Sequence, residues 1–127
     1  MPIAVVMKCI TRILFLVESI HRFGYICSSF EFIEKNMNKP ISITDLCEYS
    51  NISKSVLYKS FQKHLNTSPN QYINEKKIAK AKDLINNTEM PIKEIADNLG
   101  FTNTTYFYKL FKKVTGITPI QYKKQIK

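Results

Sequence analysis

The sequence is poor in the residues that punctuate short strands and tight turns. Its 127 residues include 3 glycines and 5 prolines, too few for the many turns of a β-sandwich or barrel. Gly24, Gly100 and Gly116 stand far apart, so no glycine-rich loop that cradles phosphates can form. Hydrophobic residues make up 44% of the chain, an ordinary value for a globular protein. The composition therefore favours one folded, all-α domain.

Metal ligands and catalytic groups are also scarce. Cys9, Cys27 and Cys47 lie 18 and 20 residues apart, which matches no zinc-binding spacing, and His21 and His64 add no paired ligands. An odd number of widely spaced thiols suits a reduced compartment. No nucleophile–base pair or carboxylate pair has usable spacing. We therefore expect a cytoplasmic protein that is not an enzyme and carries no metal or cofactor.

A long uncharged apolar run is missing as well. Lys8 and Arg12 interrupt the apolar first 17 residues, which disfavours a membrane span and leaves only a weak secretory signal. Apolar residues instead recur every three or four positions from Ile3 to Val17, as in a core helix. We expect residues 1–27 to form an apolar helix, with a membrane or export segment as the alternative. A stripe this wide predicts self-association through residues 1–26.

Acidic residues are absent from two stretches of the chain. Residues 27–127 carry 16 basic and 9 acidic side chains, yet none of the acids lies between Tyr49 and Asn74 or between Asn98 and Lys127. Lysines are frequent in both stretches. A solvated surface normally mixes the two signs, so this segregation indicates a polyanionic partner, with nucleic acid favoured over a membrane surface.

The second half of the chain repeats part of the first. Residues 56–72 align with 106–122 at an offset of 50, with seven identities in seventeen positions. Upstream the offset is 49, so the second copy has one extra residue in its turn. A repeat of this length predicts a duplicated helix pair. The identical pairs are Tyr58/Tyr108, Lys59/Lys109, Phe61/Phe111, Lys63/Lys113, Pro69/Pro119, Gln71/Gln121 and Tyr72/Tyr122.

Each copy has the signals of a short helix followed by a tight turn. Ser42 is expected to cap the first helix of copy one. The turn falls at Asn51 in copy one and at Gly100 in copy two, residue types that tolerate a positive φ. Ser53 and Thr102 are expected to cap the helix that follows.

The second helix of each copy has one apolar and one polar face. Leu57 and Phe61 share a face in copy one, as Phe107 and Phe111 do in copy two. Asn66 and Gly116 suit the left-handed end of a helix. Two helices joined by a tight turn, the second with a basic outer face, form a helix-turn-helix. The sequence predicts a first unit at residues 42–66 and a second unit at residues 91–116.

A linker helix is expected from residue 69 to 87. Ser68 and Pro69 are a helix start, as are Thr118 and Pro119 after the second unit, with Gln71 and Gln121 reaching back to the caps. Nineteen residues at about 1.5 Å each span roughly 28 Å. Successive major grooves on one face of B-DNA lie about 34 Å apart. The linker fits that distance once the width of the two units is added.

The chain resembles a known family, and most of the motifs that carry the resemblance lie in its second half. These are Ile92-x-x-Ile95-Ala96-x-x-x-Gly100-Phe101, Tyr106-Phe107-x-Lys109-x-Phe111-Lys112-Lys113 and Gly116-x-Thr118-Pro119-x-x-Tyr122. With them, residues 28–127 resemble the DNA-binding domain of the AraC/XylS family of bacterial transcription regulators. Asn51 and Asn66 stand where the family usually has glycine, and Lys77 and Lys109 where it often has arginine. Lysine cannot make the bidentate fork that arginine makes to guanine.

The resemblance implies an activator that inserts two recognition helices into successive major grooves of double-stranded promoter DNA and works with RNA polymerase. The residues that would read bases are Ser55, Tyr58, Lys59, Thr104, Thr105, Tyr108 and Lys109. The residues that would contact phosphates are Lys54, Gln62, Lys63, Lys112 and Lys113.

Two forms of such a regulator fit the chain. One is a small single-domain, MarA-like regulator. The other is a truncated regulator in which residues 1–27 are the last helix of a missing effector or dimerisation domain, and the apolar stripe favours this second form. The rival function is a helical adaptor that binds an acidic protein or a membrane surface.

Overall fold

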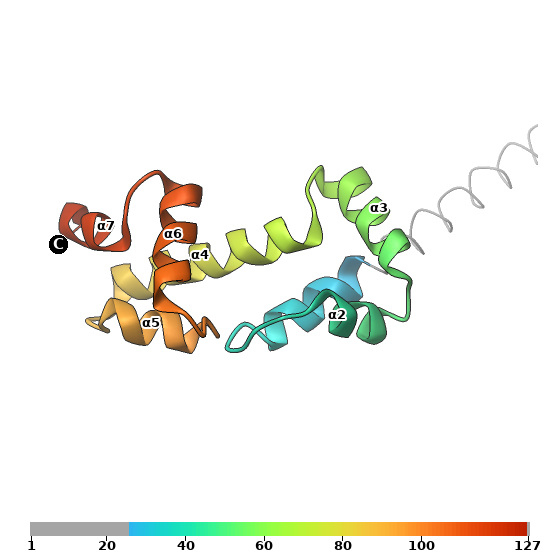
Figure 1. Ribbon diagram of the computed structural model, residues 1–127, viewed down its shortest axis with the longest axis horizontal. Helices are drawn as coiled ribbons and strands as arrows, with labels where there is room; N and C mark the ends of the chain where they lie inside the picture. Colours follow the sequence, from blue (N-terminus) through green and yellow to red (C-terminus); the bar gives the residue numbers. More distant parts are fainter. Residues whose placement is uncertain (1–25, 127) are drawn as a thin grey trace, which may run out of the picture.

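The computed structural model describes residues 26–126. These residues form helices and connecting loops, with no strand among them. The all-α expectation is therefore confirmed, as is the arrangement of two helix-turn-helix units on a linker helix (Figure 1). Of the expected helix at residues 1–27, all but the last two residues lie outside the described part. No helix of the described residues is long and apolar enough to cross a membrane.

The first unit consists of α2 (Ile43–Ser50) and α3 (Lys54–Leu65), packed on a helix that spans residues 26–35. The boundary expected between residues 27 and 28 thus falls within a helix. The predicted caps are confirmed. The hydroxyl of Ser42 accepts a hydrogen bond from the amide of Asp45, and that of Ser53 accepts one from the amide of Val56.

Both helices of the first unit end where asparagine takes a left-handed conformation. Asn51 has φ 55° and Asn66 has φ 53°. Each therefore performs the role that glycine more often has at a helix end, because asparagine tolerates this region better than most residues.

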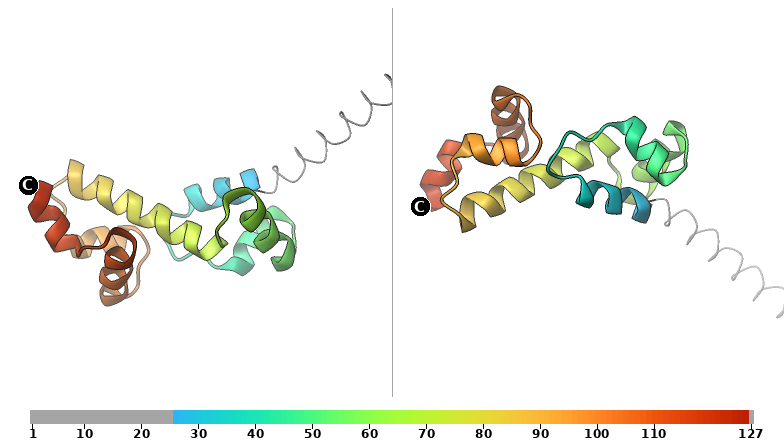
Figure 2. Two further views of the ribbon diagram at one scale, coloured as in Figure 1. Left: turned by 90° about the horizontal axis from the view of Figure 1, so that it is seen from above. Right: turned by 90° about the horizontal axis from the view of Figure 1, so that it is seen from below.

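The linker helix α4 (Pro69–Asn87) runs continuously between the units and gives the molecule its elongated shape (Figures 1 and 2). It starts as predicted, because the hydroxyl of Ser68 accepts a hydrogen bond from the amide of Gln71. The amide side chain of Gln71 does not reach back to this cap, contrary to expectation. It lies 3.2 Å from Glu75, one helical turn further on, and donates a hydrogen bond there.

The second unit consists of α5 (Ile92–Asn98) and α6 (Thr104–Thr115), followed by α7 (Pro119–Ile126). The prediction that Thr102 caps α6 is wrong. The cap is Asn103, whose side-chain oxygen accepts a hydrogen bond from the amide of Tyr106 at 3.2 Å. The extra residue in this turn moves the cap one position along the chain.

The start of α7 shows the reciprocal cap that the sequence predicts. The hydroxyl of Thr118 accepts a hydrogen bond from the amide of Gln121 at 3.2 Å, and the side chain of Gln121 accepts one from the amide of Thr118 at 3.0 Å. Two amides of the first turn, which have no partner within the helix, are thereby satisfied.

Each unit has a hydrophobic core of its own. The first core consists of five buried side chains: Ile33, Leu46, Leu57, Phe61 and Ile73. The second core is built around Phe107 and Phe111, which are 0% exposed, with Ile95 and Ala96 of α5 beside them. The core residues that the repeat pattern predicts are therefore buried. α4 contributes Ile73 to the first core and Ile78 to the second, so one helix anchors both units.

Candidate nucleic-acid interface

α3 presents a polar and basic face on the side away from its core. A helix advances about 100° per residue, so Lys59 lies opposite the buried Leu57 and Phe61. Ser55 and Lys63 lie on the same outward face, and all three polar side chains are exposed. They are available to a ligand that lies along the helix.

α6 presents the same face at the other end of the molecule. Lys109 lies opposite the buried Phe107 and Phe111, with Thr105 and Lys113 beside it, and all three of these polar side chains are exposed. Figure 1 shows α3 and α6 at opposite ends of α4. The duplicated sequence therefore gives two outward faces of matching chemistry, held apart by one helix.

Three of the predicted base-reading residues lie beside these faces and not on them, since the helical period turns them toward the core. Tyr58 and Tyr108 are half-buried. The hydroxyl of Tyr58 lies 3.4 Å from the side-chain amide of Asn70, which donates to it, and the ring of Tyr108 packs on the second core. Thr104, the first residue of α6, is also partly buried. Part of each side chain remains open to a ligand.

The predicted phosphate-contacting side chains are all exposed. Gln62 is tied by a hydrogen bond from its amide to the side-chain oxygen of Asn66, 2.9 Å away. The ammonium group of Lys54, in the first turn of α3, lies 5.9 Å from the centre of the Tyr58 ring. The members of this set are Lys54, Gln62 and Lys63 on α3, and Lys112 and Lys113 on α6.

Two exposed side chains of these faces were not among the site residues predicted from the sequence. Val56 is 39% exposed and Tyr106 is 51% exposed. They occupy equivalent positions in the repeat, three residues before Lys59 and Lys109, so they lie on the same outward faces. The repeat itself contained the signal, because an apolar residue recurs at a position that the helical period places away from the core.

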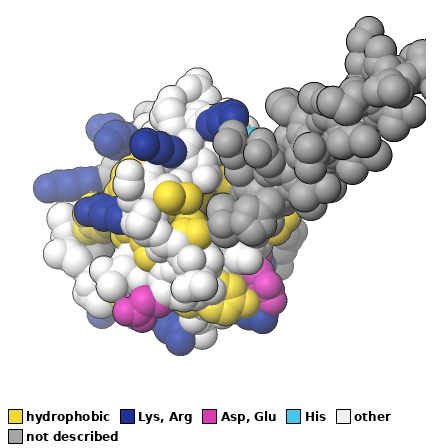
Figure 3. Space-filling model, turned by 90° about the vertical axis from the view of Figure 1, so that its right-hand side faces the viewer, with side chains coloured by type: hydrophobic (Ala, Val, Ile, Leu, Met, Phe, Trp, Pro, Cys, Tyr) yellow, Lys and Arg dark blue, Asp and Glu magenta, His cyan; other side chains and the backbone are white. Residues whose placement is uncertain are grey.

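The charges of the two faces are of one sign. α3, α6 and α7 contain no Asp or Glu. In the end-on view of Figure 3, lysines gather in the upper half of the molecule, whereas the acidic side chains lie in the lower half together with further lysines. Among residues 26–126 no cluster of His, Cys, Asp or Glu could hold a metal ion. The chemistry of the two faces is therefore that of hydrogen bonding and cationic attraction.

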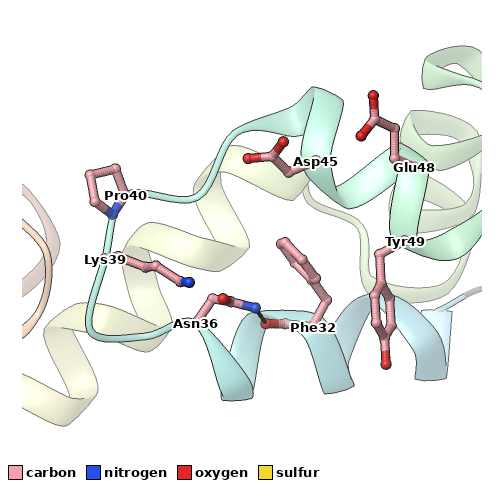
Figure 4. A pocket seen from close by; sticks show the side chains of 7 residues that line it. All are labelled: Phe32, Asn36, Lys39, Pro40, Asp45, Glu48 and Tyr49. Atoms are coloured by element: carbon pink, nitrogen blue, oxygen red, sulfur yellow. Dashed lines mark hydrogen bonds between the residues drawn. The ribbon is translucent and has the colours of Figure 1, made fainter.

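Two carboxylates and one lysine, Lys39, are among the residues that line a hollow of about 490 Å³ between α2, the loop before it and the helix of residues 26–35. Figure 4 shows Asp45 and Glu48 on the α2 side of this hollow and Phe32 and Asn36 on the side of the preceding helix. Carboxylates repel a polyanion. This hollow is therefore unsuited to the ligand that the faces of α3 and α6 would attract.

The two units meet at a buried lysine of α4. Lys77 is 5% exposed. Its ammonium group donates hydrogen bonds to the carbonyl of Lys39, at 2.9 Å, and to the carbonyl of Leu99, at 2.8 Å. It also lies 5.3 Å from the centre of the Phe101 ring. Burial lowers the pKa of Lys77 below its ordinary value of 10.5, because the charged form loses its hydration.

Comparisons with known proteins agree with this geometry. Residues 46–125 match the family model described as a helix-turn-helix domain. The raffinose operon transcriptional regulatory protein RafR of Pediococcus pentosaceus is 32% identical over 110 residues, which cover 87% of this chain and 39% of that protein. The chain spans less than half the length of the curated regulators that it matches here.

Solved structures share the fold. The C-terminal domain of AraT, a response regulator from Geobacillus stearothermophilus, is 27% identical with a TM-score of 0.76, and the match covers 80% of this chain and 84% of that one. The DNA-binding domain of AdpA, solved in complex with a target DNA, has the same fold at 15% identity, with a TM-score of 0.74 and coverage of 78% and 89%. The family model spans most of this chain, and the chain belongs to the AraC-type helix-turn-helix family of DNA-binding transcription regulators.

Proposed function

We propose that α3 and α6 enter two successive major grooves on one face of promoter DNA and read base edges there. The observation that carries this proposal is the repeated outward face, with an exposed lysine at its centre and an exposed hydroxyl beside it in both helices. An α-helix fits the major groove of B-DNA, where each base pair presents a distinct pattern of donors and acceptors.

Each side chain of the two faces has a proposed role. Lys59 and Lys109 donate to guanine oxygen or nitrogen atoms, and the apolar side chain of Val56 contacts a thymine methyl group. The hydroxyl-bearing side chains donate to or accept from neighbouring base edges: Ser55, Tyr58, Thr104, Thr105, Tyr106 and Tyr108. The remaining polar side chains contact phosphates and fix the register of the protein on the duplex: Lys54, Gln62, Lys63, Lys112 and Lys113.

The first experiment selects duplexes from a random-sequence library with the intact chain and measures their affinity against salt concentration by fluorescence anisotropy. With roughly 5–8 phosphate contacts, log affinity should fall against log salt with a slope of about −4 to −7, because counterions are released from the DNA. A slope near zero would contradict the proposal. So would a library that yields no enriched sequence, and that outcome would favour a helical adaptor with an acidic protein partner or a membrane surface.

A pair of lysine variants separates base reading from phosphate contact. Lys109→Ala should weaken the selected duplex by about 1–3 kcal/mol more than random duplex, whereas Lys63→Ala should weaken both about equally. The matched control is Lys80→Ala, which removes an exposed lysine from α4, outside both faces. Equal losses on selected and random duplex for Lys109→Ala would show that this lysine reads no base.

We further propose that binding activates transcription through contact with RNA polymerase, and that residues 1–26 mediate self-association. Both rest on the resemblance and the apolar pattern of the sequence. Transcription in vitro from a promoter that carries the selected duplex should rise with added protein, and a fall would show a repressor. Light scattering should give an assembly for the full chain and a monomer for the chain that begins at Ile26. A monomeric full chain would refute the self-association.

A further inference from the structure

The joint between the two units contains a buried polar contact. The first core ends on α4 at Ile73 and the second begins at Ile78, and no side chain belongs to both. Between them lies Lys77, whose ammonium group bonds one carbonyl from each side of the joint. Lys39 belongs to the loop that precedes α2, and Leu99 to the turn that follows α5. Figure 1 shows these two segments side by side below α4.

The space beside this joint is not filled by apolar packing. A hollow of about 440 Å³ lies there, lined by Pro40 and Ile41 from the side of the first unit and by Phe101, Asn103 and Tyr106 from the second. Apolar contacts would in any case tolerate sliding, since they have no preferred direction. The hydrogen bonds of Lys77 weaken steeply when their angle or length changes. The lysine therefore supplies the directional contact that the cores do not.

A glycine brings the backbones of the two units together at the same place. Gly100 has φ 79°, and a Cβ atom added to it would lie 2.3 Å from the carbonyl carbon of Lys39. Real Cβ atoms do not approach a backbone so closely, so only glycine permits this contact. The backbone of Lys39 therefore makes two contacts at this joint. Its carbonyl oxygen accepts a hydrogen bond from Lys77, and its backbone atoms lie close to Gly100.

We propose that Lys77, clamped between the carbonyls of Lys39 and Leu99, is a positioning residue that fixes the placement of α3 relative to α6 and thereby sets the spacing of the two DNA boxes that the chain accepts. This proposal rests on the proposed function. Each unit contacts its own part of α4, and the clamp prevents the units from turning independently about that helix. Loss of the clamp leaves each recognition helix intact, but the position of α3 relative to α6 is no longer fixed.

The consequence is measurable on DNA. One base pair inserted between two boxes moves the second box by about 3.4 Å along the axis and turns it by about 35°. A protein with a fixed joint loses most of the second unit's contacts on such a duplex. A protein with a loose joint follows the displaced box.

The test uses the full chain and the duplex that it selects from a random library, together with the same duplex carrying one inserted or one deleted base pair between the boxes. Wild type should bind the altered duplexes at least about tenfold more weakly, a loss of the size expected for a mismatched contact. Lys77→Met should discriminate less than about threefold between the same duplexes. Lys77→Arg retains the charge and the donors and should restore the discrimination, and Lys80→Met is the matched control from the exposed side of α4.

Two further measurements distinguish loss of the Lys77 contact from a general loss of structure. Affinity for a duplex that carries one box alone should be unchanged in Lys77→Met, which a general loss of structure would not allow. If circular dichroism shows that Lys77→Met is unfolded at the assay temperature, Gly100→Ala takes its place, because the added Cβ displaces Lys39 while Lys77 stays intact. Full discrimination by either folded variant would overturn the inference, whereas failure of wild type to select any duplex would overturn the proposed function instead.

Discussion

A comparison of alanine substitutions at Gly100 and Gly116 tests how closely the two units approach each other. Both have a positive φ, 79° and 88°. A Cβ atom on Gly116 would meet no atom within 4 Å, whereas one on Gly100 would lie 2.3–2.7 Å from three backbone atoms of Lys39. Substitution by alanine imposes the same left-handed strain at both positions, about 1–2 kcal/mol. The difference between the two variants therefore reports the contact with Lys39.

The magnitude of that difference follows from the contact that is lost. Gly100→Ala must move the backbone of Lys39 away, and with it the carbonyl that accepts a hydrogen bond from Lys77 at 2.9 Å. A hydrogen bond to a charged group contributes about 1.5–3 kcal/mol. We expect Gly100→Ala to lower the free energy of unfolding by about 2.5–5 kcal/mol, against about 1–2 kcal/mol for Gly116→Ala. Urea unfolding of both full-length variants, followed by circular dichroism, measures this, and equal losses would refute the close approach.

Three further predictions concern stability. Phe111→Ala should lower the free energy of unfolding by about 3–5 kcal/mol in urea titrations, because it empties a fully buried site in the second core. Asn66→Gly should raise the melting temperature and Asn66→Ala should lower it, since residue 66 has φ 53°. Burial lowers the Lys77 pKa below 10.5, so the folded chain releases this proton first as pH rises. The free energy of unfolding of wild type relative to Lys77→Met should therefore increase with alkaline pH, and a difference that is flat or falls would contradict this.

The local signals of the sequence predicted most of the helix ends. Hydroxyl caps at Ser42, Ser53 and Ser68 and left-handed ends at Asn51 and Asn66 lie where they were expected. These features depend on a few neighbouring residues, so a short stretch of sequence contains the information. Two expectations failed: Gln71 bonds Glu75 and not the cap, and α6 is capped by Asn103 and not by Thr102, in the turn where the two copies differ in length.

The joint could not be predicted in the same way. Helical periodicity treats a lysine as an exposed residue, and Lys77 is buried because Lys39, 38 residues away, and Leu99, 22 residues away, both fold onto α4. Neither the spacing of the repeat nor the charge pattern contains that long-range contact. The outward faces were predicted in part, since the lysines at their centres stood out by charge. Val56 and Tyr106 were missed because neither carries a charge, although the helical period places both away from the core.

The central claim is that two recognition helices, held by one linker helix, read two DNA boxes at once. Footprinting of the intact chain on its selected duplex tests this most directly. We expect two protected boxes on one face of the DNA with centres about one helical turn apart, roughly 10 base pairs. A single protected box, or two boxes half a turn apart on opposite faces, would contradict it.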